Sequence, residues 1–406
     1  MRHQTNYTFT IDSFNLCDYS FHNEPVRGDM KIEFFHTMNY WGKHGDSWPA
    51  PPRICEPELV GDTIEHALIE CGAALDAGFD SLNFAEHHYS PKRLTPNPII
   101  FAAVAGRQFP EAQIGVFGTD LPLNNPVRIA EEYSMLDNLV DGRLRIGMLR
   151  GTPNEYLTYG SNPWESRERY EEGILLLKAC FTEPEPFGWE GRYYRFRNIA
   201  VWPRRVQDPH PPILISGNSK DGAIFAGKHG LDLGFSYMPA EKCAQHAALY
   251  RQAAAEAGWE PTADNLQYRH FMYVTPTDAE ANETMAALSG GGLMSIFNGA
   301  SPDIMMTMAQ IGAALGGVPK HVQIDPSMAP PMVMGPPLYG SPETVLGRIK
   351  DIHEVLGMGR LEVSLGTINP LSHDAMLSSL KLIGEEIVPE LHRMGSAVQQ
   401  PGGVAS

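Results

Sequence analysis

The stretch 127–151, VRIAEEYSMLDNLVDGRLRIGMLRG, restricts the fold more than any other part of the 406-residue chain. Its apolar residues recur every three or four positions between Ile129 and Val140, which predicts a helix. Asp141-Gly142 supplies a turn that ends a helix, and an apolar strand follows at 144–149. This strand leads directly into Arg150. Helix, glycine turn, strand and terminal cation form one unit of a parallel α/β protein, where such a strand end serves ligand binding.

The same alternation of strand and helix continues through most of the chain. Apolar strands are predicted at 30–38, within 78–89, and at 113–118, 144–149, 211–216, 232–236, 267–275 and 361–365. Eight such alternations favour a (β/α)8 TIM barrel. A doubly wound sheet has the same alternation, but no G-x-G-x-x-G sequence follows a strand, so the barrel is preferred.

Several segments stand apart from the alternation. Residues 1–29 are polar and irregular, which predicts an N-terminal extension outside a barrel of residues 30–395. Aromatic residues around Gly191 predict a small hairpin outside the main sheet. Glycines, methionines and PPMVMGPP in 288–340 favour an inserted lid, with a disordered insertion as the alternative. Residues 396–406 are expected to form a flexible tail.

Composition limits the partners and the compartment. Lys+Arg 31 against Asp+Glu 48 gives a net charge of −17, which argues against nucleic acid and anionic membranes as partners. No run of about 18 apolar residues is present to span a bilayer. The five cysteines never form a C-x-x-C pair, which argues against a disulfide framework and a zinc site. A reducing cytoplasm is the expected location.

Polar residues that follow the predicted strands suggest an anion site. Arg150 and Arg167 can grip a phosphate with their forked donors. Ser219 starts a helix and adds a hydroxyl and free N–H groups. Ordinary surface ion pairs of the arginines, for instance with Glu155 or Glu171, are the alternative.

The triplet Glu86-His87-His88 follows the second strand. A histidine that acts as a general base or hydrogen-bond donor is the preferred interpretation, because imidazole titrates near neutral pH. A strand-end histidine bonded only to backbone is the structural alternative. A metal site is the weakest interpretation, because adjacent strand residues point in opposite directions; no metal ligand is predicted.

Several segments together resemble one family, the bacterial luciferase-like, flavin-dependent monooxygenases. The similar segments are NFAEHHY, LPLNNPVRIAEEYSMLDNLVDGRLRIGMLRG, ERYEEGILLLKACF, GRYYRFRNIAVWPRR, PHPPILISGNSKDGAIFAGKHGLDLGF and GSPETVLGRIKDIHEVLGMGRLEVSL. They cover roughly residues 30–391, whereas 1–29 and much of 290–340 have no recognisable counterpart. The helix–DGR–strand–RG segment is the most specific.

The resemblance implies a TIM barrel that binds FMN as FMNH2, supplied by a separate flavin reductase. In the family, O2 forms a C4a-peroxyflavin that oxygenates an organic substrate, and dimers are common, so a homodimer is expected. A deazaflavin (F420)-dependent oxidoreductase of the same superfamily is the alternative, and a non-catalytic luciferase-like subunit is another. Phe35, Trp41, Phe297 and several methionines suggest an apolar substrate.

The resemblance also implies roles for particular residues. His87 matches the family's active-site histidine, and Glu86 beside it is assigned to cofactor binding. The FMN phosphate is assigned to Arg150, Arg167 and Ser219, together with the backbone near Asn218 and Gly222. Some relatives have threonine in place of Gly222, so only its N–H can contribute here. Phe117-Gly118 aligns with a strand end that contains a non-proline cis peptide under the flavin in some members.

Overall fold

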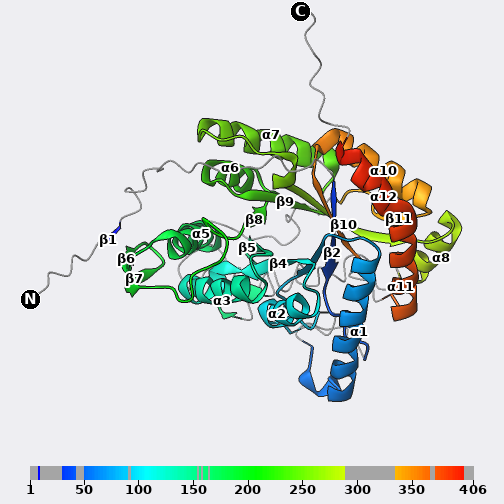
Figure 1. The fold of residues 1–406 in the computed structure, drawn as a ribbon, viewed down its shortest axis with the longest axis horizontal. Helices are drawn as coiled ribbons and strands as arrows, with labels where there is room; N and C mark the ends of the chain where they lie inside the picture. The colour runs from blue at the N-terminus through cyan, green and yellow to red at the C-terminus, as the bar shows by residue number, and fades with distance from the viewer. Residues whose placement is uncertain are drawn as a thin grey trace, which may run out of the picture.

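Eight parallel strands close into a barrel surrounded by helices in the computed structural model (Figure 1). The structure describes residues 8–9, 30–42, 50–89, 93–152, 155–156, 159–162, 165–288, 334–365 and 371–396. The barrel strands, in chain order, are β2 (Lys31–His36), β3 (Ser81–Phe84), β4 (Gln113–Asp120), β5 (Leu144–Leu149), β8 (Ile213–Ser216), β9 (Asp232–Ser236), β10 (Leu266–Val274) and β12 (Arg360–Ser364). Pairing of β10 with β9, and of β12 with β2, closes the ring. The predicted (β/α)8 TIM barrel is confirmed.

Helices follow the strands and cover the outside of the barrel. They are α1 (Pro57–Asp76), α2 (Pro98–Gln108), α3 (Pro126–Leu139), α5 (Ser166–Thr182), α6 (Lys220–His229), α7 (Ala240–Glu256), α8 (Asp278–Leu288), α10 (Pro342–Leu356), α11 (His373–Leu382) and α12 (Val388–Ser396). In α3, the side chain of Asn125 caps the first turn and Pro126 occupies the first helical position. Asp141 and Gly142, both with positive φ, then turn the chain into β5. The helix–turn–strand unit predicted at 127–151 is confirmed.

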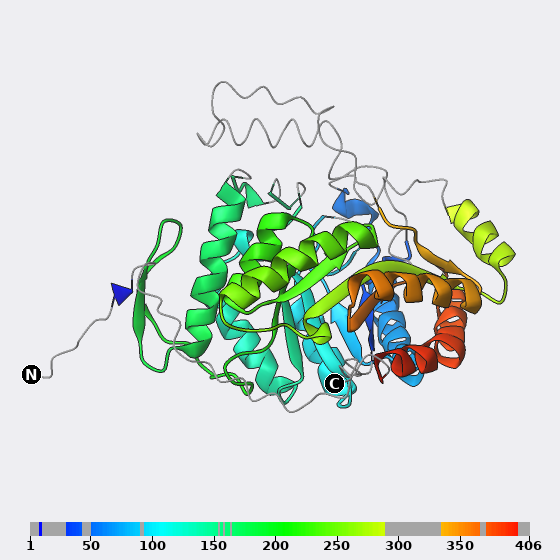
Figure 2. The ribbon, with the colours of Figure 1, turned by 90° about the horizontal axis from the view of Figure 1, so that it is seen from above.

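A small sheet stands beside α5, outside the barrel (Figures 1 and 2). β6 (Phe187–Glu190) and β7 (Arg195–Ile199) form the predicted antiparallel hairpin. Glu172 of α5 holds the hairpin, since its carboxylate accepts hydrogen bonds from the Trp189 ring and from backbone N–H groups near its turn. The short strand β1 (Thr8–Phe9) pairs in parallel with β6, so part of the N-terminal segment contacts this sheet.

Two predicted segments lie mostly outside the described residues. Of the expected lid, residues 289–333, including Phe297, are outside them, and so is the tail after residue 396. The described end of the lid segment returns to the barrel, where the N–H of Gly335 donates to the carbonyl of Tyr237 at 2.8 Å. β11 (Leu338–Gly340) then pairs with the end of β10, a strand that the sequence pattern did not predict.

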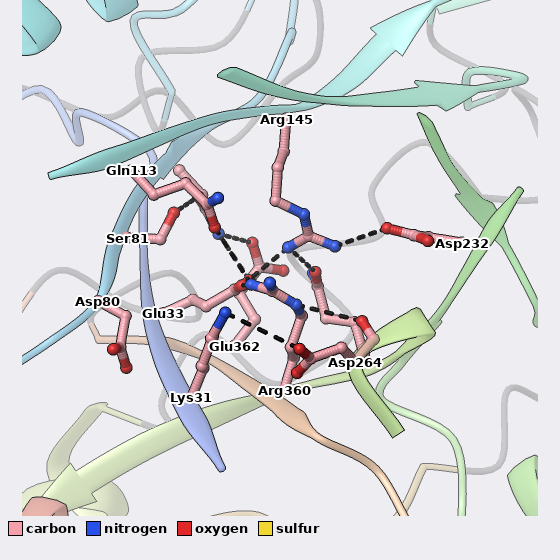
Figure 3. Close-up of polar contacts among 12 residues, drawn as sticks. Lys31, Glu33, Asp80, Ser81, Gln113, Arg145, Asp232, Asp264, Arg360 and Glu362 are labelled. Carbon is pink, nitrogen blue, oxygen red and sulfur yellow. Dashed lines mark hydrogen bonds and ion pairs between the residues drawn. The ribbon is translucent and has the colours of Figure 1, made fainter. Parts of the chain in front are cut away.

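The inward-facing positions near the amino ends of the strands carry charges rather than apolar side chains (Figure 3). Arg145 of β5 lies 2.8 Å from Glu33 of β2 and 3.0 Å from Asp232 of β9. Arg360 of β12 also pairs with Glu33, at 2.6 Å. Although burial opposes ionisation of Glu33, the neighbouring Arg145 and Arg360 lower its pKa. Ion pairs therefore fill the centre of the barrel and connect strands on opposite sides.

Three properties of the described residues bear on the composition-based expectations. No helix among them is long and apolar enough to cross a membrane. Cys55, Cys71, Cys180 and Cys243 are free thiols. The described part of the chain also contains no cluster of three His, Cys, Asp or Glu side chains placed to hold a metal ion.

Candidate functional site

A cavity between α5 and α6 gathers most of the residues assigned to phosphate binding. It is lined by Arg150, Arg167, Tyr170, Glu171, Ile215, Ser216, Ser219, Gly222 and Phe225. Ser219 caps α6, and its hydroxyl accepts a hydrogen bond from the N–H of Gly222 at 3.2 Å. The positive end of this helix therefore faces the same space as the two arginines.

The two arginines differ in how far they are already paired. Arg167 lies 3.7 Å from Glu171 and 3.6 Å from Asp221, so the alternative of a surface ion pair describes part of its surroundings. The guanidinium of Arg150 has no hydrogen-bond or ion-pair partner among the described residues. An unpaired cation beside a helix N-terminus is a favourable environment for an anion.

A second cavity opens at the carboxyl ends of the strands, where ligands of TIM barrels bind. It is lined by Phe117, Leu149, Leu214, Ser216, Gly234, Phe235, Ser236, Gln267 and Arg269. Ser216 lines both cavities, so the apolar cavity adjoins the cationic one. A planar ring system with an anionic tail matches this pair of cavities in chemistry, and FMN has that composition.

The peptide bond between Phe117 and Gly118, at this mouth, is trans. In the described part of the chain, the cis peptide bonds are those before Pro203 and Pro209. Gly118 has φ +152°, and the register of β4 against β5 shifts at this point. A Cβ on Gly118 would lie 2.8 Å from the Cβ of Ala85. Glycine is therefore required here both for the backbone conformation and for the close approach of β3.

His87, at the end of β3, pairs with a carboxylate that follows β5. Its Nδ1 lies 3.1 Å from Oε1 of Glu155. Burial opposes ionisation of Glu155, but hydrogen bonds from His87 and from Thr152 outweigh it and lower its pKa to about 2. Burial lowers the pKa of His87, and the positive charge of Arg93 adds to this effect. The arrangement is therefore a neutral imidazole whose Nδ1–H donates to an ionised carboxylate.

Glu86, assigned to cofactor binding, takes a different position. Its Oε1 lies 2.9 Å from Nε2 of His88, and its Oε2 accepts the N–H of Asp120 at 3.2 Å. Glu86 lines neither cavity and instead joins the loop after β3 to the end of β4. Glu86 thus holds the loop that carries His87 in place, and its assignment to cofactor binding stays a prediction.

Asn218 is also used within the protein. Its side-chain amide donates to the carbonyl of Ser236 at 3.0 Å, and its oxygen accepts the N–H of the same residue at 3.0 Å. These bonds tie the loop after β8 to the end of β9, and the Asn218 side chain lines neither cavity. The side chain of Asn218 is thus occupied, and its backbone is the part that can contact a bound anion.

Three neighbours of the site were not predicted from the sequence: Glu155 as the partner of His87, Arg93 and Arg269. Arg269 lies on β10, in the buried strand sequence LQYRHFMYV, where an arginine inside an otherwise largely apolar and aromatic strand is the available signal. Glu155 lies in a helical turn within the β5–α5 connection and Arg93 in the loop after β3, and in such connections spacing carries no information about which strand end a residue faces.

The fold is a TIM barrel, and its two adjoining cavities combine arginines and a helix N-terminus with apolar walls. A family model described as luciferase-like monooxygenase matches residues 56–358. The chain therefore belongs to the luciferase-like monooxygenase family, as the sequence resemblance predicted.

Curated relatives carry the names of monooxygenases. The chain is 28% identical over 234 residues to an alkanal monooxygenase alpha chain of Photorhabdus luminescens, which covers 57% of this chain and 62% of that protein. It is 25% identical over 184 residues to the oxygenase component of a flavin-dependent trigonelline monooxygenase of Acinetobacter baylyi, covering 45% and 51% of the two chains. The matches therefore leave more than a third of each relative unaligned.

Solved structures share the fold over most of the chain. Monooxygenase RslO1 of Streptomyces bottropensis superposes with a TM-score of 0.70 at 23% identity, covering 89% of this chain and 99% of the other. The oxygenating constituent of 3,6-diketocamphane monooxygenase of Pseudomonas putida, in complex with FMN, gives 0.65 at 21% identity and the same coverage. An F420-dependent secondary alcohol dehydrogenase gives 0.63 at 14% identity, so the fold alone does not separate the two cofactors.

Proposed function

We propose that this protein is an FMNH2-dependent monooxygenase that uses O2 to oxygenate an organic substrate. The observation that carries the proposal is the guanidinium of Arg150, which is paired with no described residue, beside the Ser219-capped start of α6. Its cavity adjoins an apolar one through Ser216. Arg150, Arg167, Ser219 and the N–H of Gly222 would hold the FMN phosphate. Reduced flavin, when bound, supplies the electrons that activate O2.

The protein's own contribution to the chemistry centres on His87. Because Nδ1–H donates to Glu155, the lone pair of the neutral ring lies on Nε2, which has no hydrogen-bond partner among the described residues. Nε2 is thus available to accept a proton from a group that reacts at the mouth of the barrel. Phe117, Leu149 and Phe235 supply apolar walls to the apolar cavity, and these walls limit the access of water to a ring bound there.

The first test is a titration of the purified protein with FMN, with FMNH2 under anaerobic conditions, and with F420. We expect both FMN forms to bind and F420 to bind far more weakly; the opposite order would favour the F420-dependent oxidoreductase. Turnover by the chain together with a flavin reductase would exclude a non-catalytic subunit.

The second test examines the phosphate site. Arg150→Ala should raise the Kd for FMN about 10- to 100-fold, because a hydrogen-bonded charge contributes about 1.5–3 kcal/mol. Arg128→Ala serves as the control, since Arg128 is exposed on α3 and, among the described residues, pairs with Glu132. Equal FMN affinity of the two variants would remove Arg150 from the site.

The proposal includes a flavin reductase and a second copy of this chain as partners. A trigonelline monooxygenase relative is named as the oxygenase component of its system, which supports a separate reductase. Ile100 and Val104 on α2, with Met135 and Leu139 on α3, expose apolar side chains at helical spacing, which supports a homodimer through these helices. Sedimentation of Val104→Glu as a monomer would support that interface. Free thiols at Cys71, Cys180 and Cys243 suit a cytoplasmic location.

A further inference from the structure

The charges inside the barrel nearly balance one another. Three carboxylates, Glu33, Asp232 and Glu362, contact three arginines, Arg145, Arg360 and Arg269. Arg269 is the member of this set nearest the mouth, where it lines the apolar cavity. Its Nε donates to Glu362, and its two Nη groups have no partner among the described residues. These two Nη groups can donate a pair of parallel hydrogen bonds to a planar anion such as a carboxylate.

Arg93 brings a further positive charge to the same place. It forms no hydrogen bond or ion pair with the described residues, and its Nε is a buried donor without an acceptor. The segment of Arg93 runs beside the ends of β2 and β3, because the N–H of Leu94 donates to the carbonyl of Met38 at 2.9 Å and the N–H of His87 donates to the carbonyl of Thr95 at 3.1 Å. Arg269 packs over Phe35 of β2, so both arginines belong to this side of the barrel mouth. Burial lowers the pKa of Arg93 and the charge of Arg269 adds to this, whereas Tyr237 and Glu155 raise it. The nearby carboxylate of Glu155 is already paired with His87. The Nε donor of the half-buried Arg93 is therefore shielded from water without an acceptor, and a bound anion would supply one.

We propose that Arg93 and Arg269 form a second anion site, which binds the carboxylate of an organic substrate beside His87. The proposal rests on the function proposed above and names the substrate class for the same site. The sequence predicted an apolar substrate. The proposal changes this to a substrate with an apolar skeleton and one carboxylate.

The surroundings of the two arginines suit such a molecule. The Arg269 guanidinium lies 3.9 Å above the ring centroid of Phe35, which fixes its plane. Tyr237 stacks on Phe271 at 4.3 Å beside it and offers a flat apolar surface. Both arginines also lower the pKa of His87, after burial, so a bound carboxylate lies where its charge acts on the proposed base.

The test compares charged and neutral probes of the same shape. Protein saturated with oxidised FMN, which occupies the first anion site, is titrated calorimetrically with benzoate and benzamide, and with hexanoate and hexanamide. We expect at least one carboxylate to bind about tenfold or more tightly than its amide. In Arg93→Met this preference should fall to about twofold or less.

The choice of Arg93 keeps the experiment independent of folding. Arg93→Met removes no ion pair with a described residue, so its melting temperature without probe should match that of the wild type or exceed it. Arg269→Met would leave Glu362 buried and unpaired, so Arg269→Lys is the better second variant; it retains the charge, loses the fork, and should show a partly reduced preference. Arg128→Met is the surface control.

Three results would overturn the proposal. They are the absence of a carboxylate preference in the wild type, a preference that survives Arg93→Met, and a loss of FMN affinity in Arg93→Met that accounts for the whole effect. If FMN itself fails to bind, the function proposed above fails, and the probes are then titrated into cofactor-free Arg150→Ala. A carboxylate preference that persists there and disappears when Arg93→Met is added would still support the second site, and its absence would overturn it.

Discussion

His87 and Glu155 lie 3.1 Å apart through Nδ1 and Oε1, although 68 residues separate them in the chain. The end of β3 positions the histidine, and the segment after β5 positions the carboxylate. The carboxylate fixes which nitrogen carries the proton, and so directs the free lone pair of Nε2 away from itself. Glu155 is therefore a positioning residue for His87.

Glu155→Gln tests this relationship through the pH profile. Glu155 raises the pKa of His87 against burial and Arg93, so the amide should let that pKa fall further. If neutral His87 is the active form, the acid limb of the kcat profile should shift to lower pH, while kcat falls about tenfold or more. FMN affinity should change little. Glu165→Gln, on an exposed pair with Arg169, should leave the profile unchanged; an unshifted limb in Glu155→Gln would contradict the pairing.

His87→Ala separates cofactor binding from chemistry. The variant should bind FMN as the wild type does, because His87 lines neither cavity described above. It should nevertheless convert a much smaller share of FMNH2 into product, since the proton acceptor is missing. Product formed per FMNH2 consumed is the measurement. Unchanged coupling would remove His87 from the chemistry.

Gly222→Ala tests the close contacts at the start of α6. A Cβ at this position would lie 2.6 Å from the carbonyl oxygen of Ser216 and 3.1 Å from Oγ of Ser219. The helix start must shift to relieve this contact, so we expect weaker FMN binding and a stability loss of about 1–2 kcal/mol. Gly347→Ala, with open space around its Cβ on α10, should instead stabilise by about 0.5–1 kcal/mol. Similar urea midpoints for both variants would disprove the crowding.

The sequence predicted all eight barrel strands because their outward positions, such as Ile32, Phe34 and Ile146, are apolar and alternate with the rest. The inward positions were harder to interpret. Glu33 and Arg145 contact each other across 112 residues, so their pairing exists only once the barrel closes. The contacts of Glu86 and Asn218 were hidden for the same reason. Each side chain bonds to the end of a neighbouring strand, which comes close only when the barrel closes. Arg150, Arg167 and Ser219 came together as expected because Arg150 follows β5, Ser219 caps the helix after the neighbouring strand β8, and Arg167 lies in the first turn of α5.

His270 predicts how acid should affect the protein. Its Nδ1 accepts the N–H of Phe271 at 2.9 Å, its Nε2 lies 3.2 Å from the carbonyl of Gly335, and burial lowers its pKa to about 4. The unfolded chain takes up this proton near pH 6.5, whereas the folded chain resists it. Stability should therefore be full above about pH 6.5 and decline as the pH falls toward 4. His270→Gln should reduce the slope of unfolding free energy against pH in this window by up to one proton; an unchanged slope would contradict the lowered pKa.

Arg145 should be the most costly arginine to remove. Its side chain is 2% exposed and neutralises both Glu33 and Asp232 inside the barrel. Arg145→Met preserves volume but leaves two buried carboxylates with less positive charge, so the free energy of unfolding should fall by about 3–5 kcal/mol. Arg195→Met is the matched control, because Arg195 is exposed on β7 and pairs with the exposed Glu190; it should change stability by less than about 0.5 kcal/mol. Urea denaturation at neutral pH measures both.

In Arg145→Met, Glu33 still has a positive partner in Arg360. Asp232 is therefore the carboxylate that the loss of Arg145 affects most. Adding Asp232→Asn to Arg145→Met should therefore recover part of the loss, and a further decrease would show that Asp232 does not depend on Arg145.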